Sequence, residues 1–139
     1  MLETEPVLIK EYVATGKAKI IYRHLLQLGE RTERASEASE CAAEQNMFWD
    51  MRYALYDRQN DIYNADLVDT LFGDMAQELG MNRATFDTCM QQNTHREEVR
   101  ADDAASRKLG ITGRPVFLIG ETRLVGAQPF EAFEAVLGK

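Results

Sequence analysis

The sequence has few of the residues that mark several common functional classes. It holds two cysteines, three prolines, one tryptophan and two histidines in 139 residues. Lys and Arg number 16 against 23 Asp and Glu, which gives a formal net charge of -7 and leaves no basic block to follow a phosphate backbone. Nucleic acid is therefore not an expected partner.

Long apolar runs are also absent. The first ten residues, MLETEPVLIK, have neither the basic region nor the apolar stretch of a signal peptide. We expect no membrane span and no export signal in the chain as it stands. No repeat, low-complexity tract or Pro/Gly/Ser linker divides it. With 45% apolar and 28% charged residues, the chain is expected to fold as a single domain over residues 1–139.

Hydrophobic periodicity predicts short strands near both ends of the chain and helices between them. The β-branched and aromatic run AKIIYRH at 18–24 is typical of a buried strand. Helical spacing is expected at about 5–16 and over 33–58, with a break near 45–47. Asn64 and Asn82 are the expected N-caps of two further helices, and a polar helix should end at Gly110.

The last part of the chain has the clearest pattern. The residues VFLI at 116–119 predict a short strand, and residues 120–122 connect it to a second strand at 123–125. Pro129 then suits the first turn of a closing helix. Strands at both ends around a helical block indicate an α/β or α+β layer architecture.

Three separated segments carry a family resemblance. The run GITGRPVFLIGETRLVGAQPFEAFEAVL at 110–137 resembles the C-terminal signature of the DsbA-like disulfide oxidoreductases. EYVATGKAKIIYRHLLQLG at 11–29 is similar to the end of that family's first helix and its next strand, and ECAAEQNMFWDMRYALYD at 40–57 resembles its inserted helical region. The three segments occur in the family's order.

The resemblance implies an α/β thioredoxin-like fold with a helical insertion at about 31–109. It also implies thiol-disulfide exchange with unfolded or extended protein substrates, an extracytoplasmic location and no cofactor. Members carry a Cys-x-x-Cys at the start of the first helix, after the first core strand. This chain contains no Cys-x-x-Cys, and its match begins partway along that helix. We therefore expect an incomplete fold with a three-stranded mixed sheet, inactive in dithiol exchange.

The only cysteines, Cys41 and Cys89, lie 48 positions apart on apolar helix faces. A structural disulfide between two helices is the favoured interpretation, and its loop-closure contribution would be about 4 kcal/mol. A pair of free buried thiols is the alternative, and a catalytic pair is the least favoured. The two histidines, His24 and His95, are both expected at the surface. Two cysteines and two scattered histidines do not indicate a metal site, so none is expected.

The resemblance places a substrate-binding segment at Thr112, Gly113, Arg114 and Pro115. The proline that matches Pro115 follows a cis peptide bond in the family, and the residue before it offers backbone groups to an extended peptide. Arg114 would stabilise a thiolate if a Cys-x-x-Cys were present, and otherwise it is an exposed arginine without a role.

Removing the family's first strand would leave two unpaired sheet edges, which recruit other chains. A homodimer is therefore expected. For function, an oxidoreductase of the DsbA-like kind competes with a redox-inactive module that binds peptide or a second copy by β-augmentation. A branch that conjugates or isomerises small molecules with glutathione is a weaker third alternative, because no motif for glutathione is visible.

Overall fold

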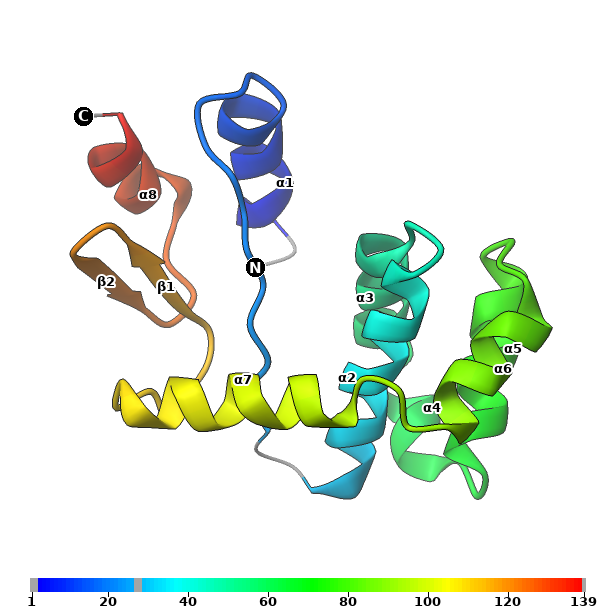
Figure 1. Ribbon diagram of the computed structural model, residues 1–139. Coiled ribbons are helices and arrows are strands. Elements are labelled where there is room, and N and C mark those ends of the chain that lie inside the picture. The colour runs from blue at the N-terminus through cyan, green and yellow to red at the C-terminus, as the bar shows by residue number, and fades with distance from the viewer. Residues whose placement is uncertain (1–2, 27–28, 139) are drawn as a thin grey trace. The chain divides into compact units, whose positions relative to one another are not determined.

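The structure, a computed structural model, describes residues 3–26 and 29–138. Its elements follow in this order: α1 (Thr4–Leu8), the π-helix η1 (Ile9–Val13), α2 (Glu30–Ala43), α3 (Phe48–Asp57), α4 (Gln59–Asn64), α5 (Val68–Glu78), α6 (Arg83–Gln91), α7 (Arg96–Lys108), β1 (Val116–Ile119), β2 (Thr122–Val125) and α8 (Phe130–Leu137) (Figure 1). Across the described ranges no helix is long and apolar enough to cross a bilayer. The chain divides into two compact units, one formed by both ends and one by residues 24–105.

The unit formed by the chain ends packs helices against one face of a hairpin. Strands β1 and β2 are antiparallel, and Phe117 pairs with Leu124 in their register. Both side chains lie against a small core of Leu8, Tyr12 and Phe133. The rings of Phe117 and Phe133 meet edge to face with centroids 4.8 Å apart, an arrangement that adds to the energy of apolar burial. This core holds α8 and the first helix to the hairpin.

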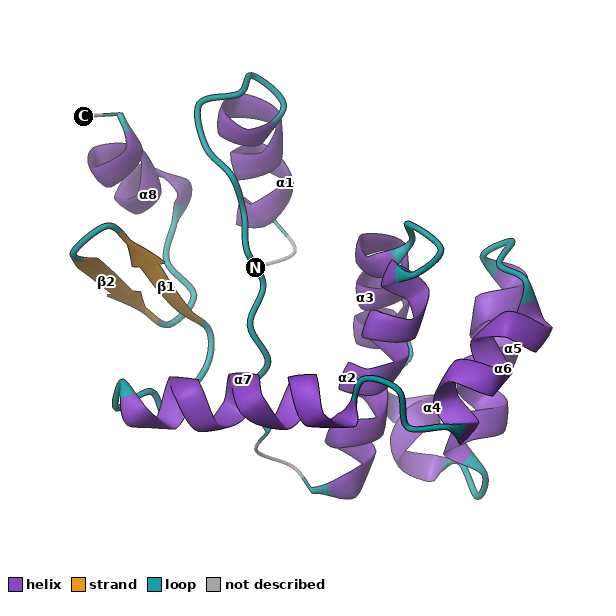
Figure 2. Cartoon of the chain, in the orientation of Figure 1, coloured by secondary structure: helices purple, strands orange, loops and turns teal. Residues whose placement is uncertain are grey.

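The predicted third strand is not formed. Residues 18–23 have no regular secondary structure, and the sheet in the described part of the chain has two strands, β1 and β2 (Figure 2). The β-branched composition of this segment was the basis of the prediction. Composition is not sufficient, because a strand exists only where a neighbouring strand supplies its ladder hydrogen bonds. Here no strand within the described ranges pairs with residues 18–23.

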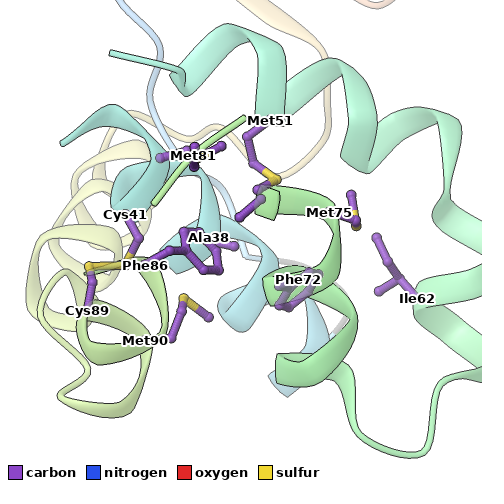
Figure 3. Packing of buried hydrophobic residues seen from close by; sticks show 12 residues of the cluster. Ala38, Cys41, Met51, Ile62, Phe72, Met75, Met81, Phe86, Cys89 and Met90 are labelled. Atoms are coloured by element: carbon purple, nitrogen blue, oxygen red, sulfur yellow. A yellow bond between two sulfur atoms is a disulfide. The ribbon is translucent and has the colours of Figure 1, made fainter. Parts of the chain in front are cut away.

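The second unit is an all-helical body with its own core. Phe72, Met51 and Phe86 are fully buried at its centre, each with 0% exposure. Figure 3 shows these side chains in one cluster with Ala38 of α2 and Met90 of α6, and the Cys41–Cys89 disulfide lies at one side of it. The complete cluster consists of Ala38, Cys41, Ala42, Met51, Ile62, Phe72, Met75, Ala76, Met81, Phe86, Cys89 and Met90. Four methionines give this core side chains that adapt to irregular space between short helices.

Two helix boundaries in this unit follow the predicted local signals and one does not. The predicted break near 45–47 is present, and Asn46 turns the chain there with a φ of 59°. Asn82 caps α6 as predicted, since its side chain accepts a hydrogen bond from the Thr85 amide at 2.9 Å. The prediction for Asn64 was wrong. Asn64 ends α4 and donates to the Asn60 carbonyl, while α5 begins at Val68.

Arg34 of α2 is a buried cation that ties several elements of this unit together. Its Nε donates to Asp69 of α5 at 3.0 Å, and its Nη1 donates to Glu37 at 3.1 Å and to Asn93 at 2.9 Å. Its Nη2 donates to the Met90 carbonyl at 3.0 Å. The hydrogen bonds to Asp69 raise the pKa of Arg34 despite its burial. Arg34 therefore fixes α5 and the α6–α7 connection against α2.

Replacing Arg34 by Met should lower the free energy of unfolding by about 3 kcal/mol, because the substitution leaves the buried Glu37 carboxylate without this partner. Arg58→Met is the matched control. Arg58 pairs with the exposed carboxylates of Asp61 and Glu78, and such surface pairs contribute less than about 1 kcal/mol. Urea unfolding of both variants measures the difference. Equal losses in the two variants would show that the Arg34 network does not hold the unit.

Candidate functional site

The predicted substrate-binding residues form one continuous loop ahead of β1. Thr112, Gly113 and Arg114 are exposed, and Pro115 is half-buried. The Arg114–Pro115 peptide bond is cis, as the resemblance implies. A Cβ placed on Gly113 would meet no atom within 4 Å, so open space surrounds this part of the loop.

The loop leads directly into a strand edge that no described strand covers. The Gly126 amide donates to the Pro115 carbonyl at 2.8 Å, so Pro115 and Gly126 form a hydrogen-bonded pair of the ladder. Because such pairs alternate along antiparallel strands, the amide and carbonyl groups of Val116 and Leu118 point away from β2. Within the described residues, β1 pairs with β2 only. The free edge of β1 thus begins at the residue after Pro115.

The face of the hairpin opposite the small core is partly apolar and open. Leu118 on β1 is 52% exposed and Val125 on β2 is 60% exposed. They alternate with Phe117 and Leu124, whose side chains face the core. Exposed large apolar side chains on a short hairpin are typical of a surface that contacts another chain.

The two cysteines form a disulfide, as the favoured interpretation stated. Cys41 of α2 and Cys89 of α6 are bonded, with their Cα atoms 5.9 Å apart. Cys41 is 1% exposed and Cys89 is 5% exposed, and both belong to the core cluster of the helical unit (Figure 3). An exchanging cysteine needs access and a stabilised thiolate. This pair instead has the position of a crosslink between two packed helices.

His95 lies beside the disulfide, which the sequence gave no reason to expect. One ring nitrogen of His95 and the Sγ atoms of Cys41 and Cys89 all lie within 4.8 Å of one another. Its Nδ1 is 2.9 Å from Glu98 Oε2, and its Nε2 is 3.0 Å from Glu44 Oε1. The His95–Glu98 spacing on α7 is visible in the sequence. Glu44 is 51 positions away, and only the packing of α2 against the start of α7 brings it to His95.

The prediction of surface histidines was wrong for His24, which is 2% exposed. Its Nε2 lies 2.8 Å from Glu40 Oε1, and its ring packs edge to face on that of Phe48, with the ring centroids 6.4 Å apart. The backbone amide of His24 donates to Asp102 at 3.2 Å. A carboxylate partner and an aromatic neighbour explain how an imidazole is accommodated in the interior. His95 is intermediate, with 18% of its side chain exposed.

Carboxylates around His95 determine its protonation. Burial lowers the pKa of His95, but the hydrogen bonds and negative charges of Glu98 and Glu44 outweigh that effect, and the net pKa is raised above 6.5. A protonated imidazole can donate to both carboxylates at once. Protonated His95 therefore ties α2 to α7 across the end of the disulfide.

His95→Gln should reduce stability in a pH-dependent manner. Because folding raises the pKa of His95, its stabilising charge is fully present below about pH 6.5 and is lost as pH rises through the folded pKa. The free energy of unfolding should therefore differ most between wild type and variant near about pH 5.5 and least near about pH 8.

Urea titrations at several pH values measure this difference, with Glu97→Gln on the exposed side of the same helix as the control. A difference between wild type and His95→Gln that does not change with pH would contradict the assignment.

Comparison with known proteins places this geometry in a family. A family model described as Thioredoxin matches residues 2–139. The solved structure of oxidised BdbD from Bacillus subtilis superposes with a TM-score of 0.79 at 18% identity, over 96% of this chain and 74% of that one. A thioredoxin-like oxidoreductase from Silicibacter pomeroyi gives a TM-score of 0.76 at 19% identity, over 99% of this chain and 75% of that one. At these identities the two likenesses establish the fold.

Among curated proteins, the Na(+)/H(+) antiporter NhaA 3 of Salinispora tropica is 26% identical over 137 residues. The alignment covers 97% of this chain, and the chain spans 20% of the antiporter's length. The antiporter's activity belongs to a much longer polypeptide. The match to the family model over nearly every residue shows that the chain belongs to the thioredoxin family, and the two superpositions show a thioredoxin-like fold.

Proposed function

We propose that this chain supplies the substrate-binding part of a DsbA-like thiol-disulfide oxidoreductase, and that it carries out no dithiol exchange itself. The free edge of β1 behind the exposed loop Thr112–Pro115 carries the proposal. An extended segment of a protein substrate can add to this edge as a further strand, with its main chain bonded to the outward groups of Val116 and Leu118. Main-chain bonding suits a binder of many unrelated unfolded proteins, because it does not read their side chains.

The state of the two cysteines supports the proposed absence of exchange. Dithiol exchange moves two electrons between a reduced and an oxidised cysteine pair, and the attacking atom is a thiolate. The sequence has no Cys-x-x-Cys. Its two cysteines, Cys41 and Cys89, are bonded to each other in the core of the helical unit. The substrate-binding loop and these cysteines belong to different units of the chain. The proposed binding loop therefore contains no cysteine of its own.

A second candidate function is an interaction module that pairs with another copy of the chain. Leu118 and Val125 favour it, because both are more than half exposed on the open face of the hairpin.

Turnover assays test the main proposal. The oxidised chain should not accelerate the reduction of insulin by dithiothreitol, because it offers no accessible thiolate pair. Precipitation of the insulin B chain, followed by turbidity, measures the rate. An acceleration that disappears in Cys41→Ser would show that the Cys41–Cys89 pair exchanges with substrate and would overturn the proposal.

Proline scanning of the hairpin tests the binding edge. Leu118→Pro removes an amide that points away from β2, so the hairpin ladder stays intact while one donor to an added strand is lost. Losing one hydrogen bond of about 0.5–1.5 kcal/mol should weaken binding of a labelled unfolded peptide by about twofold to tenfold. Val125→Pro is the matched control, because its amide points outward on the opposite edge of the hairpin. Fluorescence anisotropy with equal affinities for the two variants would exclude the β1 edge.

Light scattering tests the second candidate. A homodimer formed through the open hairpin should give twice the protomer mass at micromolar concentration, and Leu118→Pro should shift it toward the protomer. A well-folded wild type with the mass of one protomer throughout the micromolar range would contradict pairing.

A further inference from the structure

The helical unit collects metal-binding side chains from three helices at one point. Cys41 of α2, Cys89 of α6 and His95 at the start of α7 place one ligand atom each within 4.8 Å of the others. Glu40 and Glu98 form a second group with His95 at the same range. Sulfur and imidazole nitrogen are the ligands that Zn²⁺ prefers in proteins. In the structure described here the two sulfur atoms are bonded to each other, so they are not available to a metal.

We propose that reduction of the Cys41–Cys89 disulfide creates a zinc site formed by both cysteine thiolates and His95. Ligands of a tetrahedral Zn²⁺ lie about 3.5–3.8 Å apart, which follows from metal–ligand distances of about 2.0–2.3 Å. The three atoms therefore need to move little to surround one ion. The chain would then exist in two forms, one closed by a sulfur–sulfur bond and one closed by a metal.

Neighbouring carboxylates complete the donor set. Glu98 and Glu44 bind opposite nitrogens of the His95 ring, at 2.9 and 3.0 Å. When one ring nitrogen binds the metal, the carboxylate on the other nitrogen fixes the orientation of the ring, as in many zinc sites. The carboxylate that is displaced lies next to the ion and can serve as the fourth ligand. The two glutamates thus provide both orientation and a ligand without any new residue.

Charge favours a cation at this position once the disulfide is opened. Two thiolates beside Glu40, Glu44 and Glu98 would place several negative groups close together in a partly buried region, where like charges repel strongly. A divalent ion cancels much of that repulsion and keeps the sulfur atoms deprotonated. Without the ion, the thiols would take up protons and behave as ordinary core side chains.

Access to the sulfur atoms comes from the surface at α6. A hollow of about 450 Å³ reaches Cys89. Its lining consists of Glu44, Ala84, Thr85, Thr88, Cys89, Gln92 and Thr94. A small reductant and a metal ion can approach the disulfide by this route, although little of either cysteine is exposed. Glu44 is part of the lining and also binds His95, so the hollow and the proposed site adjoin.

The redox step balances with a dithiol as the reductant. A dithiol gives two electrons and two protons to the Cys41–Cys89 bond and closes to a cyclic disulfide, leaving two cysteine thiols. Binding of Zn²⁺ then releases the two thiol protons as two zinc–sulfur bonds form. The metal replaces the covalent crosslink between α2 and α6, so the helical unit keeps a tie between them in a reducing environment.

Cobalt substitution tests the site on the 139-residue chain. Reduced wild type should bind one equivalent of Co²⁺ and develop the near-ultraviolet absorption of sulfur-to-cobalt charge transfer, and Zn²⁺ should displace it. The oxidised chain should show no such absorption. A reduced, folded chain that gives no sulfur-to-cobalt band would overturn the proposal. Equal binding of Co²⁺ by the oxidised chain would also overturn it, because surface carboxylates alone would then hold the ion.

Two variants separate His95 from its surroundings. In the reduced state, His95→Ala should weaken Co²⁺ binding by at least about tenfold, because a direct ligand is lost. Glu97→Ala, on the same turn of α7 but exposed, should bind as wild type does. Equal affinity in His95→Ala and wild type would contradict the assignment of His95.

Thermal unfolding provides a readout that remains useful if reduction loosens the chain. Zn²⁺ should raise the melting temperature of the reduced wild type and leave that of the oxidised wild type unchanged, because a ligand stabilises only the form that binds it. Refolding of a loosened reduced chain on addition of Zn²⁺ would equally support the site. A reduced chain whose circular dichroism and melting temperature do not respond to Zn²⁺ would refute it.

Discussion

The bond between Cys41 and Cys89 is the constraint on which the rest of the helical unit depends. It joins α2 to α6 inside an apolar cluster, and α6 leads directly into the turn that carries His95. Closing a loop of 48 residues stabilises the folded state by about 4 kcal/mol in the chain-entropy model. The same bond joins the two cysteines that the sequence contains.

Local patterns were sufficient for the elements that depend on neighbours in the sequence. The cap at Asn82, the break at Asn46 and the hairpin at 116–125 all follow from turn chemistry and side-chain period. The cysteine pairing was also accessible, since two apolar helix faces each presented one sulfur. The family resemblance predicted the residues of the proposed substrate-binding loop. The free edge of β1 was found only in the structure, from the ladder hydrogen bonds.

Features that depend on distant partners were not predictable from the sequence. Residues 18–23 have the composition of a strand but lack a neighbouring strand in the described fold. His24 is buried because the carboxylate of Glu40 hydrogen-bonds its imidazole. The two residues are 16 positions apart, and no helix or strand period connects them. His95 gained its position from Glu44, which lies 51 positions earlier. In each case the deciding interaction is tertiary, and a single sequence does not record which segments meet.

Thiol trapping under native and denaturing conditions tests most directly whether Cys41 and Cys89 form a structural crosslink. Protein purified without reductant is alkylated with iodoacetamide, first folded and then in guanidinium chloride, and its peptides are mapped by mass spectrometry. The account predicts no alkylation in either state and a stoichiometric peptide pair that joins Cys41 to Cys89. Alkylation of both cysteines in the folded, unreduced protein would contradict it.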